Sequence, residues 1–300
     1  MYAIMGATGN TGKVVATSLL AKGEKVRVIG RSADRLQSLA ARGAEPFVGD
    51  VTDAGALSKA FADARALYVM IPPNMTSKDF RADQGRVTEA IAKALEATGV
   101  KYAVSLSSIG ADKTEKTGPV VGLRNLEQRL NGIAGLNVLH LRTGYFMENT
   151  LAQIGIIKMM AMAAGPLRPD LKLPMIATRD IGAFAAEALL RLDFSGSQTR
   201  ELLGQRDISM AEAAAIIGKA IGKPGLTYFQ APEGQVRASM VQLGMSMNIA
   251  NLLLEMSAAL NSGYMRALEA RTEKNTTLTS YETFVAEEFV PRYQGKSTAA

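Results

Sequence analysis

Residues 2–13, with the sequence YAIMGATGNTGK, decide the fold of this chain. The stretch begins with the apolar run Tyr2–Met5, which is typical of a short buried strand. Beyond the glycines, residues 12–22 carry their apolar side chains at the spacing of one helix face. A strand, a glycine turn and a helix in this order indicate the start of a βαβ unit.

The turn itself has the spacing G-x-x-G-x-x-G. Gly6 permits a sharp turn, Gly9 lets a phosphate approach the backbone, and Gly12 lets the helix pack closely on the strand. The backbone N–H groups that open the helix would then point at an anion, aided by the helix dipole. The residues predicted to hold the pyrophosphate are Gly6, Gly9, Asn10, Thr11 and Gly12, and Thr8 is predicted to bind the cofactor as well.

Short apolar runs alternate with amphipathic segments through the first half of the chain. This alternation predicts βαβ units and a parallel sheet, and right-handed crossovers make the sheet doubly wound. We therefore expect an α/β fold of the Rossmann type. The expected strands are 2–5, 25–29, 46–48, 66–71, 102–106 and 137–142, and the expected helices are 12–22, 33–41, 54–62, 81–98 and 123–130.

After residue 150 the pattern changes. Ser209 followed by Glu212 is a capping box that predicts a helix start. The other expected elements are helices at 180–192, 209–221, within 232–270 and at 279–289, a strand at 200–203, and a frayed tail at 294–300.

This change predicts two domains. We expect a dinucleotide-binding domain at 1–150 and a smaller, mainly helical substrate domain at 151–300. Within the second, residues 175–204 are expected to pack back on the first domain's sheet.

Composition narrows the possible partners. The 300 residues include 34 basic and 28 acidic side chains, with no long basic run, so no nucleic-acid partner is expected. One histidine and no cysteine argue against a metal site. No signal peptide is visible, and the apolar stretch 151–167 is interrupted by Gln153 and Lys158, so we expect no membrane partner and a cytoplasmic location. A homodimer is left open.

Two strand ends bear on the choice of dinucleotide. The second strand ends at Gly30, and Arg31 stands where an NAD site usually has a carboxylate. A guanidinium suits the 2′-phosphate of NADP(H), although a solvated arginine at a helix start is the alternative. Asp50, beside Val51 at the end of the third strand, could accept a hydrogen bond from the adenine amino group or cap the helix that begins at Ala54.

The fourth and fifth strands end at the same edge of the sheet. Ile71 and Pro72 close the fourth strand, and the proline stiffens a loop at the crevice where a dinucleotide would lie. Ser107 and Ser108 close the fifth strand near the expected nicotinamide ribose. The alternative for both serines is an ordinary loop start.

Together these motifs resemble the NmrA-like family of atypical short-chain dehydrogenases. The resemblance implies a Rossmann domain with a smaller C-terminal substrate domain and NADP(H) as cofactor. The family includes NADPH-dependent reductases of quinones and triphenylmethane-type dyes, isoflavone-reductase-like enzymes, and redox sensors that are not catalysts. The matching segments are GATGNTGK (6–13), Gly30-Arg31, Gly49-Asp50-Val51, Ser107-Ser108, LRTGYFMEN (141–149) and PMIATRDIGAFAAE (174–187).

One departure from the pattern of short-chain dehydrogenases bears on catalysis but not on cofactor binding. Typical short-chain dehydrogenases use a Tyr-x-x-x-Lys pair, but the region after Ser108 reads PVVGLRNLE at 119–127. The lysine of isoflavone-reductase-like relatives corresponds to Leu123, with Arg124 beside it. Arginine does not readily release a proton, so it is a poor general acid.

Other side chains could supply the proton or bind the substrate. Tyr145 follows the sixth strand and could hydrogen-bond a carbonyl, or serve only as an aromatic wall of the cleft. It is the single catalytic candidate, and Tyr145, Phe146 and Asn149 are the predicted substrate-binding residues. His140 is expected to be a hydrogen-bonded core residue, and Glu127 to lie on a helix surface.

The C-terminal half is rich in methionine. Met240, Leu243, Met247, Ala250 and Leu254 recur at steps of three and four, which predicts one helical face. Flexible thioethers suit a lid over a flat apolar substrate, but equally suit core packing or a dimer contact.

These observations favour an NADPH-dependent reductase that delivers hydride to a small apolar acceptor, such as a quinone, an enone or a dye. The main alternative is a non-catalytic NADP(H)-binding redox sensor. An isomerase or dehydratase that uses bound NADP is a third possibility without a dedicated residue.

Overall fold

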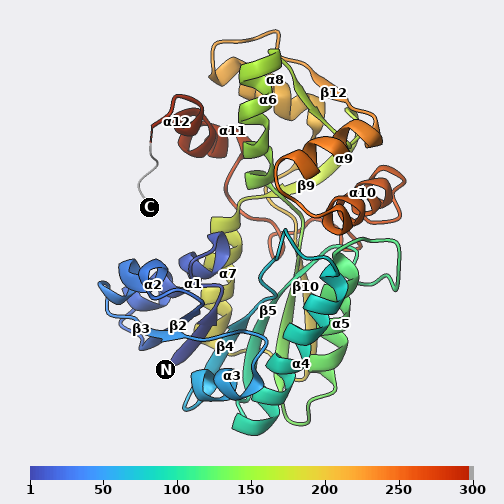
Figure 1. Cartoon of the computed structure of the whole chain (residues 1–300). Coiled ribbons are helices and arrows are strands. Elements are labelled where there is room, and N and C mark those ends of the chain that lie inside the picture. Colours follow the sequence, from blue (N-terminus) through green and yellow to red (C-terminus); the bar gives the residue numbers. More distant parts are fainter. Residues whose placement is uncertain (297–300) are drawn as a thin grey trace.

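The computed structural model describes residues 1–296, and its centre is a parallel sheet of seven strands (Figure 1). The strands are β1 (Tyr2–Met5), β2 (Val26–Gly30), β3 (Glu45–Val48), β4 (Ala66–Val69), β5 (Tyr102–Ser108), β6 (Asn137–Thr143) and β10 (Ser197–Leu202). Their order is β3-β2-β1-β4-β5-β6-β10, and each neighbouring pair is parallel. The chain reverses its direction of winding between β1 and β4, so the predicted doubly wound α/β fold is confirmed.

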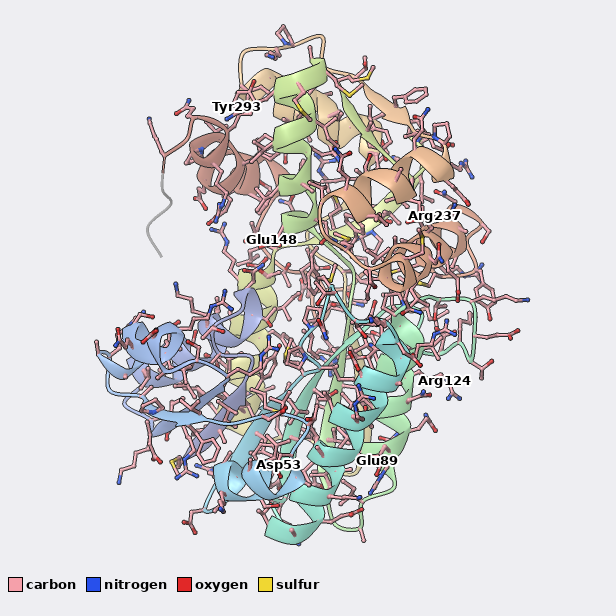
Figure 2. The ribbon with its side chains drawn as sticks, in the orientation of Figure 1. Asp53, Glu89, Arg124, Glu148, Arg237 and Tyr293 are labelled. Carbon is pink, nitrogen blue, oxygen red and sulfur yellow. The ribbon has the colours of Figure 1, made fainter. Side chains whose placement is uncertain are left out.

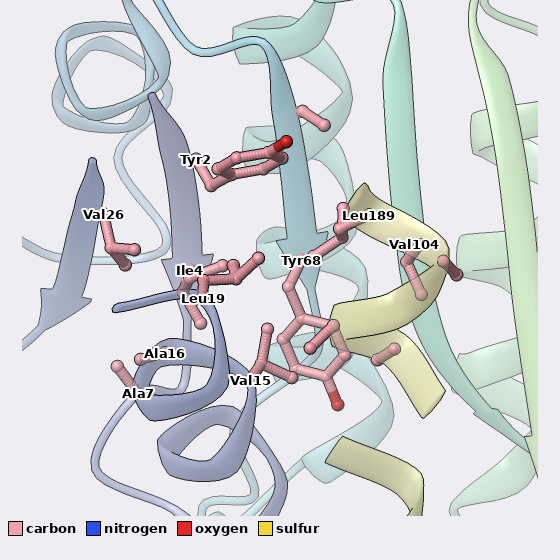
Figure 3. Packing of buried hydrophobic residues seen from close by; sticks show 14 of the residues in the cluster. Tyr2, Ile4, Ala7, Val15, Ala16, Leu19, Val26, Tyr68, Val104 and Leu189 are labelled. Atoms are coloured by element: carbon pink, nitrogen blue, oxygen red, sulfur yellow. The ribbon is translucent and has the colours of Figure 1, made fainter. Parts of the chain in front are cut away.

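Helices cover both faces of this sheet (Figure 1). One face carries α1 (Asn10–Ala21), α2 (Ala33–Ala40) and α7 (Thr178–Arg191), and the other carries α3 (Ala54–Phe61), α4 (Phe80–Thr98) and α5 (Val120–Asn131). Figure 3 shows the first face, where Tyr2, Ile4 and Tyr68 of the sheet lie against Val15 and Leu19 of α1. All five side chains are fully buried, so removal of apolar surface from water holds α1 on the sheet.

Local signals fix where the helices begin. The Asp53 carboxylate accepts hydrogen bonds from the backbone N–H groups of Gly55 (2.8 Å) and Ala56 (3.1 Å), and so caps α3. Asp79 caps α4 in the same way. The alternative that Asp50 caps the helix beginning at Ala54 is therefore wrong, because Asp53 does so.

The C-terminal part has two small sheets and a set of short helices. Its elements are β7 (Tyr145–Phe146), η1 (Met147–Ala152), α6 (Gln153–Met160), β8 (Ala163–Gly165), β9 (Lys172–Ile176), β11 (Asp207–Ser209), α8 (Met210–Ala220), β12 (Tyr228–Gln230), α9 (Glu233–Gln242), α10 (Met247–Asn261), α11 (Tyr281–Phe284), η2 (Val285–Phe289) and α12 (Val290–Tyr293). The sheets have the orders β11-β9-β7 and β12-β8. Their common core includes Ile157, Met175, Ile217 and Phe284.

The chain returns from this part to the central sheet. β10 pairs with β6 in parallel, and α7 packs on α1 so closely that a Cβ at Gly182 would lie 2.5 Å from Val14 Cβ. Glu148 of η1 accepts hydrogen bonds from the backbone N–H and the hydroxyl of Thr178 at the start of α7. Figure 2 shows Glu148 where the upper and lower parts of the molecule meet. The boundary between two domains at residue 150 stays a prediction.

The methionine-rich region does not form the single helical face that the sequence predicts. It forms two helices, because Gly244 has a φ of +92° and the Ser246 hydroxyl caps a new helix by accepting from Ile249 N–H. Leu243 and Met247 are exposed, whereas Ala250 and Leu254 are buried. The predicted single helical face is therefore wrong.

The capping box of Ser209 and Glu212 is confirmed at the start of α8. Within residues 1–296 no helix combines the length and the apolar character that crossing a membrane requires. Most of the tail expected to fray, residues 297–300, lies outside the described residues.

Candidate functional site

The glycine turn has the geometry of an anion site. Gly6 has a φ of +62°, a conformation that favours glycine, and its carbonyl accepts a hydrogen bond from Gly9 N–H (2.8 Å). Gly9 is the N-cap residue of α1 and no side chain caps the helix there. The first N–H groups of a helix have no partner within it, so those of Asn10 and Thr11 are available to phosphate oxygens.

The remaining residues of the turn have distinct tasks. A Cβ at Gly12 would lie 2.3 Å from the Gly6 carbonyl oxygen, so glycine is required for the close approach of α1. Thr8 is exposed on the open side of the turn. The Thr11 hydroxyl instead faces the core and accepts a hydrogen bond from the Tyr68 hydroxyl (2.9 Å). Thr11 can therefore contribute its backbone to a ligand but not its side chain.

Arg31 and Asp50 lie near one another at the ends of β2 and β3. Both side chains are exposed, and the positive charge of Arg31 is among the influences on the Asp50 carboxyl. Hydrogen bonds from the N–H and hydroxyl of Thr52, at 2.9 Å each, are the main cause that lowers the pKa of Asp50. Val51 is buried in the core beside α3, so its side chain is not open to a ligand.

A cavity of about 310 Å³ opens at the carboxyl ends of β4, β5 and β6, beneath the C-terminal part. Its wall is mostly apolar, and its size is at the lower end of ordinary small-molecule sites. It brings together six of the predicted site residues: Ile71, Ser107, Ser108, Tyr145, Phe146 and Asn149. Pro72 is half-buried beside this wall, between the lining residues Ile71 and Pro73.

Ser107 is hydrogen-bonded to one member of an ion pair, Glu127, whose partner is Arg142. Its hydroxyl donates a 2.5 Å hydrogen bond to Glu127 Oε1, and Glu127 is 1 % exposed on α5. Arg142 of β6 holds both oxygens of this carboxylate, with Nε at 3.0 Å and Nη2 at 2.6 Å. The expectation that Glu127 lies on a helix surface is therefore wrong.

Tyr145 contributes a phenol to the cavity. Burial raises the pKa of Tyr145 to about 12, and hydrogen bonding with the Asn149 side chain partly offsets that effect. A phenol in this environment stays protonated at neutral pH and can donate a hydrogen bond to an acceptor atom. The position of Tyr145 in the wall is compatible with both of its predicted roles, donor and aromatic surface.

His140 lies outside the cavity and is fully engaged. Its Nδ1 lies 3.1 Å from Ser105 Oγ and its Nε2 lies 2.8 Å from Asn131 Oδ1. Burial lowers its pKa to about 4, so the ring is neutral at pH 7. The expectation of a hydrogen-bonded core histidine is confirmed.

Sequence reasoning missed several parts of the site. Met256, Leu260 and Met265 form the wall that faces the ends of the strands, and Gln84 contributes from α4. Gln84 Nε2 donates to the Pro119 carbonyl (3.0 Å). These residues come from elements far apart in the chain, so no local motif marks them.

The fold, the glycine turn and the cavity at the sheet edge define a nucleotide-binding protein of the Rossmann type. The model of the NmrA-like family matches residues 2–290. This chain therefore belongs to the NmrA-like family, and the predicted family is confirmed.

Named relatives and solved structures are similar to this chain over most of its length. An NAD(P)H azoreductase of Xenophilus azovorans is 27% identical over 267 residues, covering 88% of this chain and 89% of the relative. An NADPH-dependent quinone oxidoreductase of Escherichia coli, complexed with NADPH, has a TM-score of 0.75 at 24% identity, covering 100% and 96% of the two chains. The triphenylmethane reductase of Citrobacter sp., complexed with NADP(H), has a TM-score of 0.75 at 19% identity, covering 96% and 100%.

Proposed function

We propose that this chain is an NADPH-dependent oxidoreductase that reduces a small apolar acceptor of the quinone, enone or dye type. The observation that carries the proposal is the apolar cavity lined by Ser107, Ser108 and Tyr145, at the strand ends of a Rossmann sheet that begins with a glycine turn. Names of relatives support the same chemistry, since they include an azoreductase, a quinone oxidoreductase and a triphenylmethane reductase.

The residues of the turn fit a dinucleotide. The N–H groups of Asn10 and Thr11 would hold the pyrophosphate, because Gly9 leaves no side chain between them and the ligand. Arg31 would pair with the 2′-phosphate, and Asp50 would accept from the adenine amino group. NADPH, when bound with its nicotinamide toward the cavity, supplies a hydride.

Within the cavity the protein's own groups orient the acceptor and exclude water. Phe146, Met256 and Leu260 offer apolar surface to a flat acceptor, and the Tyr145 hydroxyl can donate a hydrogen bond to the atom that gains charge. Tyr145 need not be a strong acid, since a reduced quinone can take its proton from water. The absence of a Tyr-x-x-x-Lys pair is therefore compatible with turnover.

The alternative is a redox sensor that binds NADP(H) and regulates a protein partner. The missing Tyr-x-x-x-Lys pair favours it, as does the presence of such sensors in the family. The cytoplasmic location and the homodimer left open by the sequence stay predictions under either function.

One assay distinguishes the reductase from the redox sensor. The purified protein is mixed with NADPH and a panel of quinones, enones, azo dyes and triphenylmethane dyes, and NADPH oxidation is followed by absorbance. The reductase predicts oxidation of NADPH with at least one class of acceptor. Tight NADPH binding without oxidation by any of them would leave only the sensor.

A further inference from the structure

Two polar layers lie between the strands β5 and β6 and the helix α5. Ser105 pairs with His140 in the register of the two strands, and Ser107 pairs with Arg142 two residues further on. Helix α5 supplies one partner to each layer, since Asn131 contacts His140 and Glu127, one turn earlier, contacts Arg142. Ser105 and His140 of the first layer are buried, whereas the second layer borders the cavity through Ser107.

The second layer fixes the direction of the Ser107 hydroxyl group. A carboxylate can only accept hydrogen bonds, and a guanidinium can only donate them. Arg142 occupies both oxygens of Glu127, and Ser107 donates its single O–H to Oε1 at 2.5 Å. The Thr143 hydroxyl donates to the Ser107 carbonyl (3.1 Å) and so holds the backbone at this point.

A hydroxyl that has donated its hydrogen retains its acceptor lone pairs. Ser107 is 2 % exposed, so bulk water does not compete freely for them, and the residue lines the cavity. A buried acceptor of this kind is best satisfied by an N–H or O–H donor on the ligand.

We propose that Glu127 and Arg142 are positioning residues that make Ser107 an obligatory hydrogen-bond acceptor for the nicotinamide half of the cofactor. The donor is a hydroxyl of the nicotinamide ribose or the N–H of the carboxamide. This inference rests on the proposed NADPH binding. It also removes Ser107 as the proton source for the reduced acceptor, which leaves that task to Tyr145 or water.

Glu127→Gln reverses the pattern with little change of shape. The amide oxygen of glutamine keeps the hydrogen bond from Arg142 Nη2, and its NH₂ group takes the position of Oε1, where it donates to Ser107. The serine O–H then turns toward the cavity, and the Arg142 Nε–H loses its acceptor. A donor now faces the donor of the cofactor. We expect NADPH affinity to fall about tenfold, the cost of one buried hydrogen bond left unmade.

The test is a double-mutant cycle on the dissociation constant of NADPH, measured by fluorescence. Ser107→Ala should weaken NADPH binding. Glu127→Gln should weaken it in the protein that retains Ser107 but should add no loss to Ser107→Ala. Ser105→Ala is the matched control, because this serine holds the equivalent position in the first layer but contacts His140 and does not line the cavity, and it should leave NADPH affinity unchanged. Adenosine 2′,5′-bisphosphate, which lacks the nicotinamide half, should bind all four proteins of the cycle equally.

The outcomes are distinct. Wild-type protein that does not bind NADPH would overturn the proposed cofactor. NADPH binding with additive effects of Glu127→Gln and Ser107→Ala, or equal losses with the bisphosphate, would overturn this inference alone. If Glu127→Gln does not fold, the NADPH-to-bisphosphate comparison for Ser107→Ala decides instead. The 3-acetylpyridine analogue of NADPH, which lacks the carboxamide N–H, assigns the donor: an effect that persists identifies the ribose, and one that vanishes identifies the carboxamide.

Discussion

The Tyr68 hydroxyl on β4 donates a 2.9 Å hydrogen bond to the Thr11 hydroxyl in the first turn of α1. Both side chains are buried, at 0 % and 5 % exposure, and burial raises the pKa of the Tyr68 phenol. This bond ties the start of the helix to the sheet beneath it. Because the Thr11 side chain is engaged by Tyr68, Thr11 can offer only its backbone N–H group to an anion at the glycine turn.

Replacement of Thr11 by valine tests this division of tasks. Thr11→Val leaves the buried Tyr68 hydroxyl without an acceptor, so the free energy of unfolding should fall by about 1–3 kcal/mol. Adding Tyr68→Phe should recover part of the loss, since both partners are then apolar. NADPH affinity should be unchanged in both variants. A large loss of affinity in folded Thr11→Val would place the hydroxyl on the ligand.

Gly12 and Gly85 offer a matched comparison of two helical glycines. A Cβ at Gly12 would lie 2.3 Å from the Gly6 oxygen and 2.9 Å from the Met5 oxygen, whereas nothing lies within 4 Å of one at Gly85. Gly12→Ala should lower stability by about 1–3 kcal/mol and weaken NADPH binding, because the backbone must move. Gly85→Ala should raise stability by up to about 1 kcal/mol. Urea denaturation measures both, and equal effects would contradict the packing described.

Arg31 tests the choice of dinucleotide. Arg31→Ala should weaken NADPH binding about 10- to 100-fold through loss of a charged hydrogen bond to the 2′-phosphate, and leave NADH binding unchanged. Arg42→Ala, an exposed arginine beyond the end of α2, is the control and should alter neither. Titration of both nucleotides gives the answer. Equal affinity of wild type and Arg31→Ala for NADPH would remove Arg31 from the site.

His140 makes stability depend on pH. Its pKa is lowered by burial from 6.5 to about 4, so the unfolded chain binds the proton more tightly than the folded chain does. The contribution of the neutral ring is complete above pH 6.5 and is lost as the pH falls through 4. We expect a loss of about 3 kcal/mol over this interval, measured by urea denaturation. His140→Asn should be less stable at neutral pH but should lack this part of the pH dependence; an unchanged slope would show that other groups cause it.

Features of the fold and the site that depend on neighbours in the chain could be predicted from the sequence, whereas contacts between distant segments could not. The glycine turn and the capping box of Ser209 and Glu212 depend on neighbours in the chain, so their spacing was sufficient. The walls formed by Met256 and Met265 depend on how the C-terminal part lies over the sheet, which no spacing reveals. The prediction of one methionine-rich helical face did not take account of Gly244, whose positive φ lies between the end of one helix and the start of the next.

The sequence contained a signal that Glu127 is buried. It lies four residues after Leu123 and three before Leu130, and Leu126 is its neighbour, so it belongs to the apolar face of α5. A carboxylate on that face requires a buried partner. Arg142 supplies it from β6, but that pairing depends on the alignment of β5, β6 and α5 in three dimensions.

The central claim is that NADPH bound at the glycine turn is oxidised by an acceptor held in the cavity. The most direct measurement is a single turnover, in which protein carrying one equivalent of NADPH is mixed with a quinone or an azo dye in a stopped-flow instrument. We predict rapid loss of reduced nicotinamide absorbance in the wild type. Met256→Trp, which fills the cavity, should abolish that loss while NADPH remains bound. Bound NADPH that persists in the wild type, or is oxidised equally fast in Met256→Trp, would contradict the account.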